Sequence, residues 1–426
     1  MRVAMVSANT ESINMPVMPL GMACVVKAIV NAGHEVASIN LMSERDGLKG
    51  LATRLQAFRP HVIGISIRNI DDQVSAGTRF YLEPVQAIVS ICRQFSNATI
   101  VLGGPGYSIF PRQVLSYLGV DLGIQGEGEA SFIMLLDRLE RGEDLSAVAG
   151  LHCASLGISN PPAVEKDIDG FSLPDPVRQI FSTGGQKGET VWMPFQTRRG
   201  CPLNCIYCST AAIEGKLIRK RSLDAVIASL EKFVAAGFDR FFFVDNTFNL
   251  PHGYAKKLCA GIIASGLNIR WRCILYPWKV DETLAQLMAD AGCAEVSLGF
   301  ESGSDTILRE MNKKFRTPDV RRACDLLGDA HIRRMGFLLL GVPGETKATV
   351  QKSLEFADSL KLEMVKVTIG PRIYPNTDLA RHAAQTGYIA DADSLLLPKF
   401  YIEKGMETWI RETLKAWMKN RPNWIH

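Results

Sequence analysis

The sequence predicts an α/β protein in which two βα series follow one another and a small helical segment ends the chain. Short apolar runs alternate with helical stretches over residues 1–145, and again over residues 191–375. A stretch rich in Gly, Ser and Pro separates the two series at residues 146–190. Residues 376–426 carry a helical pattern. These ranges predict two α/β domains, a connector and a helical tail.

Size and composition narrow the class of protein. The 426 residues leave room for two or three domains, and the net charge of +4 gives no support for nucleic acid as a partner. The N-terminus lacks the pattern of a signal peptide, and no uncharged apolar run reaches membrane-spanning length. Seven cysteines are scattered, which is typical of free thiols in a reducing compartment. We therefore expect a cytoplasmic protein without a membrane span.

The first series predicts a doubly wound, Rossmann-like parallel sheet. A helix is expected from Pro19 to Ala32, because Pro favours the first turn and Gly33 follows the end. Ligands bind beyond the carboxyl ends of the strands in such sheets. The expected strands are Val3–Ser7, Val36–Leu41, Val62–Ile67, Thr99–Leu102 and Gly123–Gln125.

Polar and glycine-rich segments follow three of these strands. The segments contain Ser66, Arg68 and Asn69 after the third strand, Gly103 and Gly104 after the fourth, and Gly126, Gly128 and Glu129 after the fifth. Glycine allows the backbone to approach a ligand closely. Tight strand-to-helix turns are the plainer interpretation of each segment alone. Three such ends at one sheet edge favour a cofactor-binding face.

The second series predicts another set of parallel strands. Two short apolar pieces in the connector indicate a small hairpin within a strap between the domains. Parallel barrels place their chemistry at the carboxyl ends of the strands. The expected strands are Phe195–Arg198, Arg240–Val244, Arg270–Leu275, Glu295–Phe300, Gly336–Leu340 and Val365–Ile369.

Cys201, Cys205 and Cys208 lie just after the first of these strands, at spacings of four and three. Three thiolates on one loop can bind three corners of a cubic iron–sulfur cluster and leave one iron open to a small molecule. A zinc site would need a fourth ligand nearby, but His152 and His252 lie more than forty residues away. Disulfides would need an oxidising compartment.

The cysteine loop resembles that of the radical S-adenosylmethionine (SAM) family. The resemblance implies a partial (β/α)6 barrel of the TIM type and a [4Fe–4S] cluster on these three cysteines. It also implies that SAM binds the open iron and is cleaved reductively to a 5′-deoxyadenosyl radical. An external electron donor such as flavodoxin or ferredoxin would supply the electron.

The same resemblance implies residues that contact SAM. Tyr207 would lie against the adenine, Asp245 and Asn246 would bind the amino group, and Glu301 with Ser302 would take the ribose. Gly341 and Pro343 would line the adenine. Core packing or helix capping is the plainer role for each of these residues. The basic residues that the sequence places near the cluster or the SAM carboxylate are Arg198, Arg199, Lys216, Arg272, Lys366 and Arg372.

The first domain resembles the cobalamin-binding domain of one radical SAM subclass. Three features carry this resemblance: Pro-Leu-Gly after the first strand, Gly-Gly after the fourth and Gly-Glu-Gly-Glu after the fifth. The resemblance implies cobalamin on the sheet edge described above. The Asp-x-His-x-x-Gly signature of cobalt-ligating histidine is absent, and His61 is interpreted as structural.

These features favour a radical SAM enzyme that uses cobalamin to transfer methyl to an unactivated carbon of a small molecule. A radical lyase, dehydratase or epimerase is a second hypothesis, and a non-catalytic iron–sulfur scaffold is a third. The tail carries Trp409, Trp417 and Trp424 at helical spacing. We expect this helix to pack across the barrel opening, with a substrate wall or a lipid-facing surface as alternatives.

Overall fold

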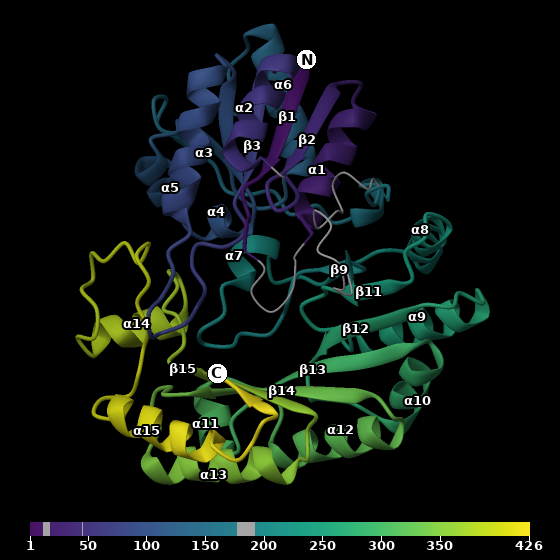
Figure 1. Cartoon of the computed structure of the whole chain (residues 1–426), viewed down its shortest axis with the longest axis vertical. Helices are drawn as coiled ribbons and strands as arrows, with labels where there is room; N and C mark the ends of the chain where they lie inside the picture. The colour runs from purple at the N-terminus through teal and green to yellow at the C-terminus, as the bar shows by residue number, and fades with distance from the viewer. Residues whose placement is uncertain (12–17, 45, 177–191) are drawn as a thin grey trace.

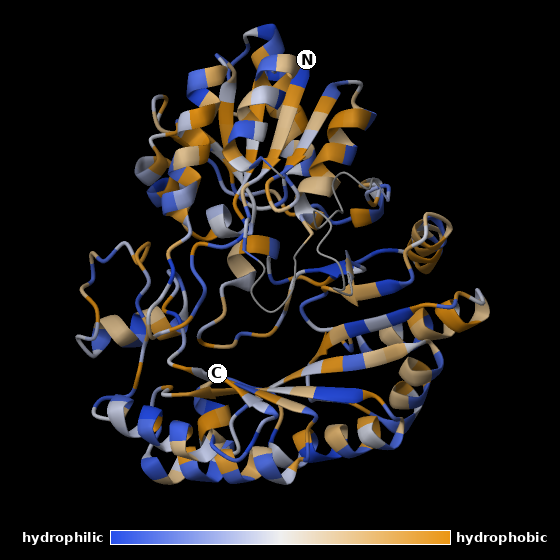
Figure 2. Ribbon diagram, viewed as in Figure 1, coloured by the Kyte–Doolittle hydropathy of each residue, from blue (hydrophilic) through white to orange (hydrophobic). Residues whose placement is uncertain are grey.

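The computed structural model describes residues 1–11, 18–44, 46–176 and 192–426. Two seven-stranded sheets lie one above the other, with the N-terminal domain at the top of Figure 1 and the second domain below it. Figure 2 shows apolar residues concentrated in the upper sheet and polar residues along the outer sides of the lower helices. The cysteine loop follows the first strand of the lower sheet, between the two domains.

The first sheet has the order β2-β1-β3-β4-β5-β6-β7, and β1 to β5 are parallel. Alternate residues of β1 enter two separate cores, because successive side chains of a strand point to opposite faces. Helices α1 and α6 cover one face, while α2, α3 and α5 cover the other. The bounds are β1 Arg2–Ser7, α1 Leu20–Asn31, β2 Glu35–Asn40, α2 Gly47–Phe58, β3 Val62–Ser66, α3 Leu82–Phe95, β4 Thr99–Gly103, α4 Pro105–Ile109, α5 Pro111–Leu118, β5 Leu122–Ile124 and α6 Glu129–Arg141.

The predicted end of the first domain at residue 145 is too early. Strands β6 (Leu151–Cys153) and β7 (Ile158–Ser159) form a hairpin, and β6 pairs antiparallel with β5. The hairpin therefore extends the first sheet instead of lying in a strap. The hairpin belongs to the first sheet because its buried residues Leu151 and Cys153 pack into the core beneath α6.

The second sheet has the order β16-β15-β14-β13-β12-β11-β8 and is entirely parallel. Its helices lie on the outer side, as in a partial barrel (Figure 1). The bounds are β8 Met193–Phe195, α8 Leu223–Ala235, β11 Arg240–Phe243, α9 His252–Ala264, β12 Arg270–Leu275, α10 Glu282–Asp290, β13 Cys293–Glu301, α11 Asp305–Glu310, α12 Thr317–Asp329, β14 Arg333–Leu340, α13 Lys347–Ser359, β15 Met364–Ile369 and β16 Trp424–Ile425.

Short elements frame the cysteine loop. Strand β9 (Arg198–Arg199) pairs with β10 (Arg219–Lys220) in a separate two-stranded sheet, and α7 (Thr210–Glu214) lies between them in sequence. The strand predicted over Phe195–Arg198 therefore ends at Phe195. The cysteine loop and α7 are held between the ends of this small ribbon, directly beneath the first domain (Figure 1).

The C-terminal segment joins both domains. Residues 371–402, which include α14 (Asp378–Gln385), contribute Ile373 and Leu379 to the core beneath α3 and α5 of the first domain. Helix α15 (Glu407–Met418) lies beside α13 on the outer side of the second sheet (Figure 1). The expectation that it crosses the barrel opening is wrong, because α15 lies on the outer side, where Trp409 packs against the core and lies beneath the Lys347 ammonium of α13 at 5.5 Å. Among the described helices, none is both long and apolar enough to span a membrane.

Candidate cofactor site

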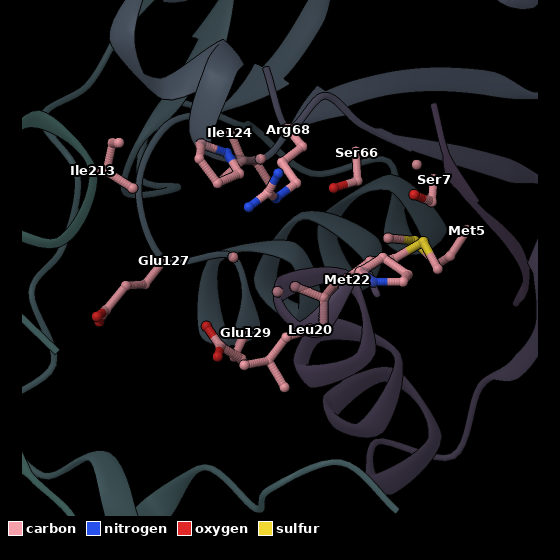
Figure 3. A pocket seen from close by; sticks show the side chains of 18 of the residues that line it. Met5, Ser7, Leu20, Met22, Ser66, Arg68, Ile124, Glu127, Glu129 and Ile213 are labelled. Atoms are coloured by element: carbon pink, nitrogen blue, oxygen red, sulfur yellow. The ribbon is translucent and has the colours of Figure 1, made fainter. Parts of the chain in front are cut away.

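A cavity of about 350 Å³ lies between the carboxyl-end edge of the first sheet and the residues around β8 and α7. Seven of the eight residues predicted to contact cobalamin line it; Figure 3 shows part of its wall. Those seven are Ser66, Arg68, Gly103, Gly104, Gly126, Gly128 and Glu129. Asn69 does not line it and instead faces a neighbouring hollow of about 20 Å³. The position of Asn69 therefore does not agree with its predicted contact to cobalamin.

The wall of the cavity suits a bulky cofactor with apolar and hydrogen-bonding parts. Gly104 has a φ of +95°, and a side chain there would meet the Ile67 carbonyl at 2.6 Å. Gly64 makes room for the Met5 side chain in the wall, because a Cβ there would lie 2.5 Å from the Met5 sulfur. The Pro19-Leu20-Gly21 segment at the start of α1, which the sequence analysis linked to the cobalamin-binding domain, also lines the cavity. Met5 and Ser7 line it too, but the sequence analysis did not single them out, because residues within a buried strand give no signal beyond core packing.

Arg68 projects toward this cavity (Figure 3). Partial desolvation lowers the pKa of Arg68, although its side chain remains exposed toward the cavity. An arginine so placed provides hydrogen-bond donors on a rigid plane. It is therefore suited to a polar group of a cofactor or a substrate.

The acidic segment after β5 binds the second domain. Glu127 pairs with Arg219 at 2.7 Å and with Arg199 at 3.4 Å, and Glu129 pairs with Arg199. Burial alone would raise the pKa of Glu129, but the Arg199 charge holds it below its ordinary value. The predicted role of Glu129 as a free cofactor contact needs correction, because its carboxylate holds the domains together. Arg199, which the sequence analysis placed near the cluster, is likewise engaged in these ion pairs.

The three cysteines lie on a loop that neighbouring segments hold in place by hydrogen bonds. Ile206 donates its amide to the Met311 carbonyl at 3.4 Å, and Leu379 donates to the Ile206 carbonyl at 2.9 Å. Cys201 is buried, Cys205 is partly buried and Cys208 is exposed. Within the described ranges, no three His, Cys, Asp or Glu side chains are gathered closely enough to hold a metal ion.

The thiols nevertheless affect one another. Burial raises the pKa of Cys201 to about 11, and the charges of Cys208 and Cys205 add to this rise. Thiolates that repel one another in this way are stabilised by a bound metal, which takes up their charge. Three soft sulfur donors on one short loop fit an iron–sulfur cluster.

Tyr207, Glu301 and Lys313 form a compact group beside the loop. The Tyr207 hydroxyl donates to Glu301 at 2.9 Å, and the Lys313 ammonium lies 2.8 Å from Tyr207 and 3.2 Å from Glu301. Glu301 has a φ of +63° at an irregularity between β13 and β14. A non-glycine residue in this region is strained, and such strain gathers at functional sites. The sequence analysis missed Lys313, whose position depends on the turn after α11.

Asp245 is buried among protein donors, whereas Asn246 is half-buried beside Glu214. Asp245 accepts hydrogen bonds from the amides of Thr197 and Arg198, at 2.7 and 3.0 Å, and pairs with the Arg198 guanidinium at 3.1 Å. Asn246 donates to Glu214 at 2.6 Å. The expectation that Asp245 binds the SAM amino group conflicts with this burial, because β8 ends early and its next amides need an acceptor.

Ser302, Gly341 and Pro343 are all buried. Ser302 hydrogen-bonds with Ser353 at 2.9 Å and accepts the Ser304 amide. Gly341 is covered by Ile402, whose Cγ2 would lie 3.2 Å from a Cβ at that position. Ser302 therefore shapes the turn after β13.

Arg372, one of the basic residues proposed for the SAM carboxylate, is engaged within the protein. Arg372 pairs with Asp71 of the first domain at 2.9 Å and donates to the carbonyls of Ile373 and Leu395. Arg272 lies over the Trp192 ring at 4.8 Å. The proposal that Arg372 binds SAM or substrate is therefore wrong, since its guanidinium is buried within a protein network.

Comparison with known proteins assigns both domains. Residues 6–136 match the B12 binding domain, and residues 196–357 match the radical SAM superfamily. The chain belongs to the radical SAM superfamily and carries a B12-binding domain. This radical SAM enzyme uses a [4Fe–4S] cluster and SAM, and the first domain adds cobalamin. The predicted family, fold class and cofactors are confirmed.

Named relatives extend this assignment. An uncharacterized methyltransferase of Pyrococcus horikoshii is 28% identical over 86% of this chain and 78% of its own length. Tryptophan 2-C-methyltransferase of Streptomyces laurentii is 24% identical over 88% of this chain and 74% of its own. A magnesium-protoporphyrin IX monomethyl ester cyclase of Cereibacter sphaeroides is 25% identical over 80% and 56%.

A solved structure has the same fold along the whole chain. The radical SAM methyltransferase TsrM of Kitasatospora setae, with cobalamin and a [4Fe–4S] cluster bound, superposes with a TM-score of 0.88. The match covers 100% of this chain and 92% of TsrM at 22% identity. The radical SAM enzyme therefore shares the arrangement of both domains with TsrM.

Proposed function

We propose that this radical SAM enzyme transfers a methyl group to an unactivated carbon of a small-molecule substrate. The main support for this proposal is that both domains line the same cavity. Its lining includes the sheet edge of the B12-binding domain and also Gln196, Ile213 and Glu214, which flank the cysteine loop. Relatives named as methyltransferases over most of the chain support the same reaction.

When bound, the cluster and SAM supply hydrogen abstraction from carbon, and cobalamin supplies the methyl group. Cys201, Cys205 and Cys208 would hold the cluster. Glu301 is turned toward Tyr207 by its strained backbone, so we assign it to the SAM ribose and Tyr207 to the adenine. Gly341 and Pro343 would form the apolar wall near the adenine, because both are buried at the end of β14.

Lys313 replaces the arginines as our candidate for the SAM carboxylate. Its ammonium lies within hydrogen-bond distance of Glu301 and of Tyr207 in the cysteine loop. Ser66, Arg68 and the Gly103–Gly104 turn would contact cobalamin across the cavity. The ion pairs of Arg199 and Arg219 with Glu127 would keep the two cofactor sites facing each other.

A reductant must deliver an electron to the cluster, and we propose a flavodoxin or ferredoxin of the cytoplasm. All ten cysteines are free, which agrees with a reducing compartment. The relative named as a cyclase supports a second candidate, in which the radical rearranges or closes the substrate and no methyl is added.

The test is anaerobic reconstitution with iron, sulfide and hydroxocobalamin, followed by desalting. We expect nearly one cobalamin per chain in the corrin absorbance and 5′-deoxyadenosine on reduction with SAM. A substrate screen by mass should then show a gain of one methyl group. Cleavage of SAM without retained cobalamin, or a product of unchanged mass, would favour the cyclase-like alternative.

The Cys205→Ala variant tests the cluster assignment. We expect it to lose full iron loading and SAM cleavage, because two cysteines of the loop are too few for the cluster. Cys324→Ala is the matched control, since Cys324 is a buried free thiol on α12 away from the loop. Cleavage of SAM by Cys205→Ala would contradict the assignment.

A further inference from the structure

Glu214 is a half-buried carboxylate at the point where the cavity meets the start of the cysteine loop. It ends α7 and lines the cavity together with Gln196, which follows β8. The Glu214 carboxylate accepts the Gly200 amide at 3.0 Å, one residue before Cys201. It also accepts the side-chain amides of Gln196 at 2.8 Å and of Asn246 at 2.6 Å. The carboxylate is therefore fixed between the ends of β8 and β11, beside the first cysteine of the loop.

The backbone at Gly200 allows α7 to approach the cysteine loop this closely. Gly200 has a φ of +87°, and a side chain there would clash with the Leu217 carbonyl oxygen. Cys201 donates its amide to the Gly215 carbonyl at 3.1 Å, so the loop begins against the end of α7. The chain that carries the cluster thus also holds the Glu214 carboxylate in place.

The basic side chains of this region are bonded to other carboxylates. Arg219 pairs with Glu127 at 2.7 Å, and Arg199 pairs with both Glu127 and Glu129. Two arginines and two glutamates therefore balance one another. Within the ranges that the structure describes, the Glu214 carboxylate is bonded only to neutral amides. Its negative charge is unmatched by the residues beside it, which favours a cationic ligand.

Asn246 adds a second acceptor next to this carboxylate. A carboxylate only accepts hydrogen bonds, so the amide nitrogen of Asn246 faces Glu214 and its amide oxygen is left for another donor. Among the described residues, none donates to that oxygen, and Asn246 is half-buried. An ammonium group has three N–H donors, whereas a sulfonium has none. A charged acceptor beside a neutral one therefore suits an ammonium group.

We propose that Glu214 and Asn246 together bind the ammonium group of SAM. The radical SAM assignment implies that SAM binds the open iron, and Glu214 lies at the start of the loop that holds the cluster. The negative charge for this group comes from α7, because Asp245 at the end of β11 is satisfied by protein donors. The proposal rests on the radical SAM assignment and not on methyl transfer.

The test is equilibrium binding of SAM to the reconstituted, oxidised protein without a reductant, with the iron content of each variant measured in parallel. For Glu214→Gln we expect binding weaker by roughly tenfold or more, because a hydrogen bond between two charged groups loses one charge. A SAM analogue that lacks the amino group should bind this variant and wild type equally. The double variant Glu214→Gln/Asn246→Asp should recover most of the affinity for SAM, because it returns the charge to the neighbouring side chain.

Glu231→Gln is the matched control. Glu231 is exposed on α8, and this substitution removes the same charge from the surface of the same domain. Its affinity for SAM should stay at the wild-type value, which shows that net charge alone does not account for the effect.

Normal affinity for SAM in a fully iron-loaded Glu214→Gln variant would overturn the proposal. Equal weakening for SAM and for the analogue without the amino group would also overturn it, as would a double variant that recovers no affinity. If Glu214→Gln fails to load iron, Asn246→Ala decides, because it keeps the bond between Glu214 and Gly200. Unchanged SAM affinity in that variant overturns the proposal, and weakened affinity supports it. Absence of a methylated product alongside the expected binding effects would contradict only the proposed function.

Discussion

Asp245 accepts three hydrogen bonds, although no part of its side chain reaches solvent. Its partners are the Thr197 amide and hydroxyl and the Arg198 amide, and the Arg198 guanidinium lies beside it. These donors satisfy the hydrogen-bonding capacity of the carboxylate without any ligand. At the scale of single residues, Asp245 therefore connects the end of β11 to the start of the cysteine loop.

We expect Asp245→Asn to destabilise the protein by about 3–5 kcal/mol, because it leaves the buried Arg198 charge unpaired. Chemical unfolding of the reconstituted protein measures this loss. Asp239→Asn is the control, since its side chain is 72% exposed, and it should change stability by less than about 0.5 kcal/mol. Unchanged stability with weakened SAM binding would instead support the ligand role.

At the scale of elements, residues 399–406 cover the ends of β14 and β15. Ile402 packs on Gly341, and Glu403 accepts the Gly344 amide at 2.7 Å. Glu345 is 3% exposed beneath this segment. Burial raises the pKa of Glu345 to about 7, and the charge of Glu403 adds to the rise while the amides of Gly341 and Val342 oppose it. The turn after β14 therefore holds a proton that the unfolded chain would release.

This proton makes stability depend on pH. The unfolded carboxyl loses its proton near pH 4.5 and the folded one near pH 7, so stability falls as pH rises between these values. The Glu345→Gln variant lacks this titration. We therefore expect its free energy of unfolding, relative to that of wild type, to increase by about 2 kcal/mol as the pH rises from 5 to 8. Thermal unfolding across this range is the measurement. Glu407→Gln, on an exposed pair, should give a curve parallel to wild type, and a parallel curve for Glu345→Gln would refute the prediction.

The strands show how far the sequence could predict the fold. The predicted bounds of the parallel strands agree with the structure to within three residues, because each is a short apolar run between turn signals. Strand β16 was missed, since Trp424–Ile425 is too short to show a period and is defined only by its pairing with β15. The hairpin β6–β7 was found, but its membership of the first sheet depends on contacts with β5.

The parts of the site that depend on short sequence motifs were predicted from the sequence. The cysteine spacing and the glycine-rich strand ends identified the cluster loop and most of the cavity wall. The ion pairs were not predictable, because Glu129 and Arg199 are 70 residues apart and Asp71 and Arg372 are 301 apart. Residues assigned to ligands, such as Arg372, thus proved to be bonded to distant parts of the chain.

At the scale of the whole molecule, the pair of Asp71 and Arg372 connects the two domains. Each side chain is 1% exposed, and Ser75 in the same loop donates to the Ile369 carbonyl at 2.6 Å. The loop from β3 to α3 thus reaches the end of β15 (Figure 1). Because cobalamin would lie between the domains, this contact should help to retain it.

We expect Asp71→Asn to release cobalamin during desalting and to speed proteolysis of residues 371–402 by about tenfold or more, since about 1.4 kcal/mol of lost interaction gives that factor. Iron content should stay the same. Glu11→Gln, which breaks an exposed pair with Arg79, is the control and should change neither readout. Normal cobalamin retention by Asp71→Asn would show that the other contacts between the domains suffice.

The packing of residues 371–402 on the first domain also has a consequence during protein synthesis. All strands of the first sheet have been made by residue 159, yet Ile373, Leu379 and Leu396 complete one of its cores. At ~5–20 residues per second, the ribosome needs roughly 12–50 s to reach residue 402. For that time the apolar surface that these residues complete lies uncovered on the nascent chain. We expect newly made protein to depend on chaperones at this stage, more than its mature stability would suggest.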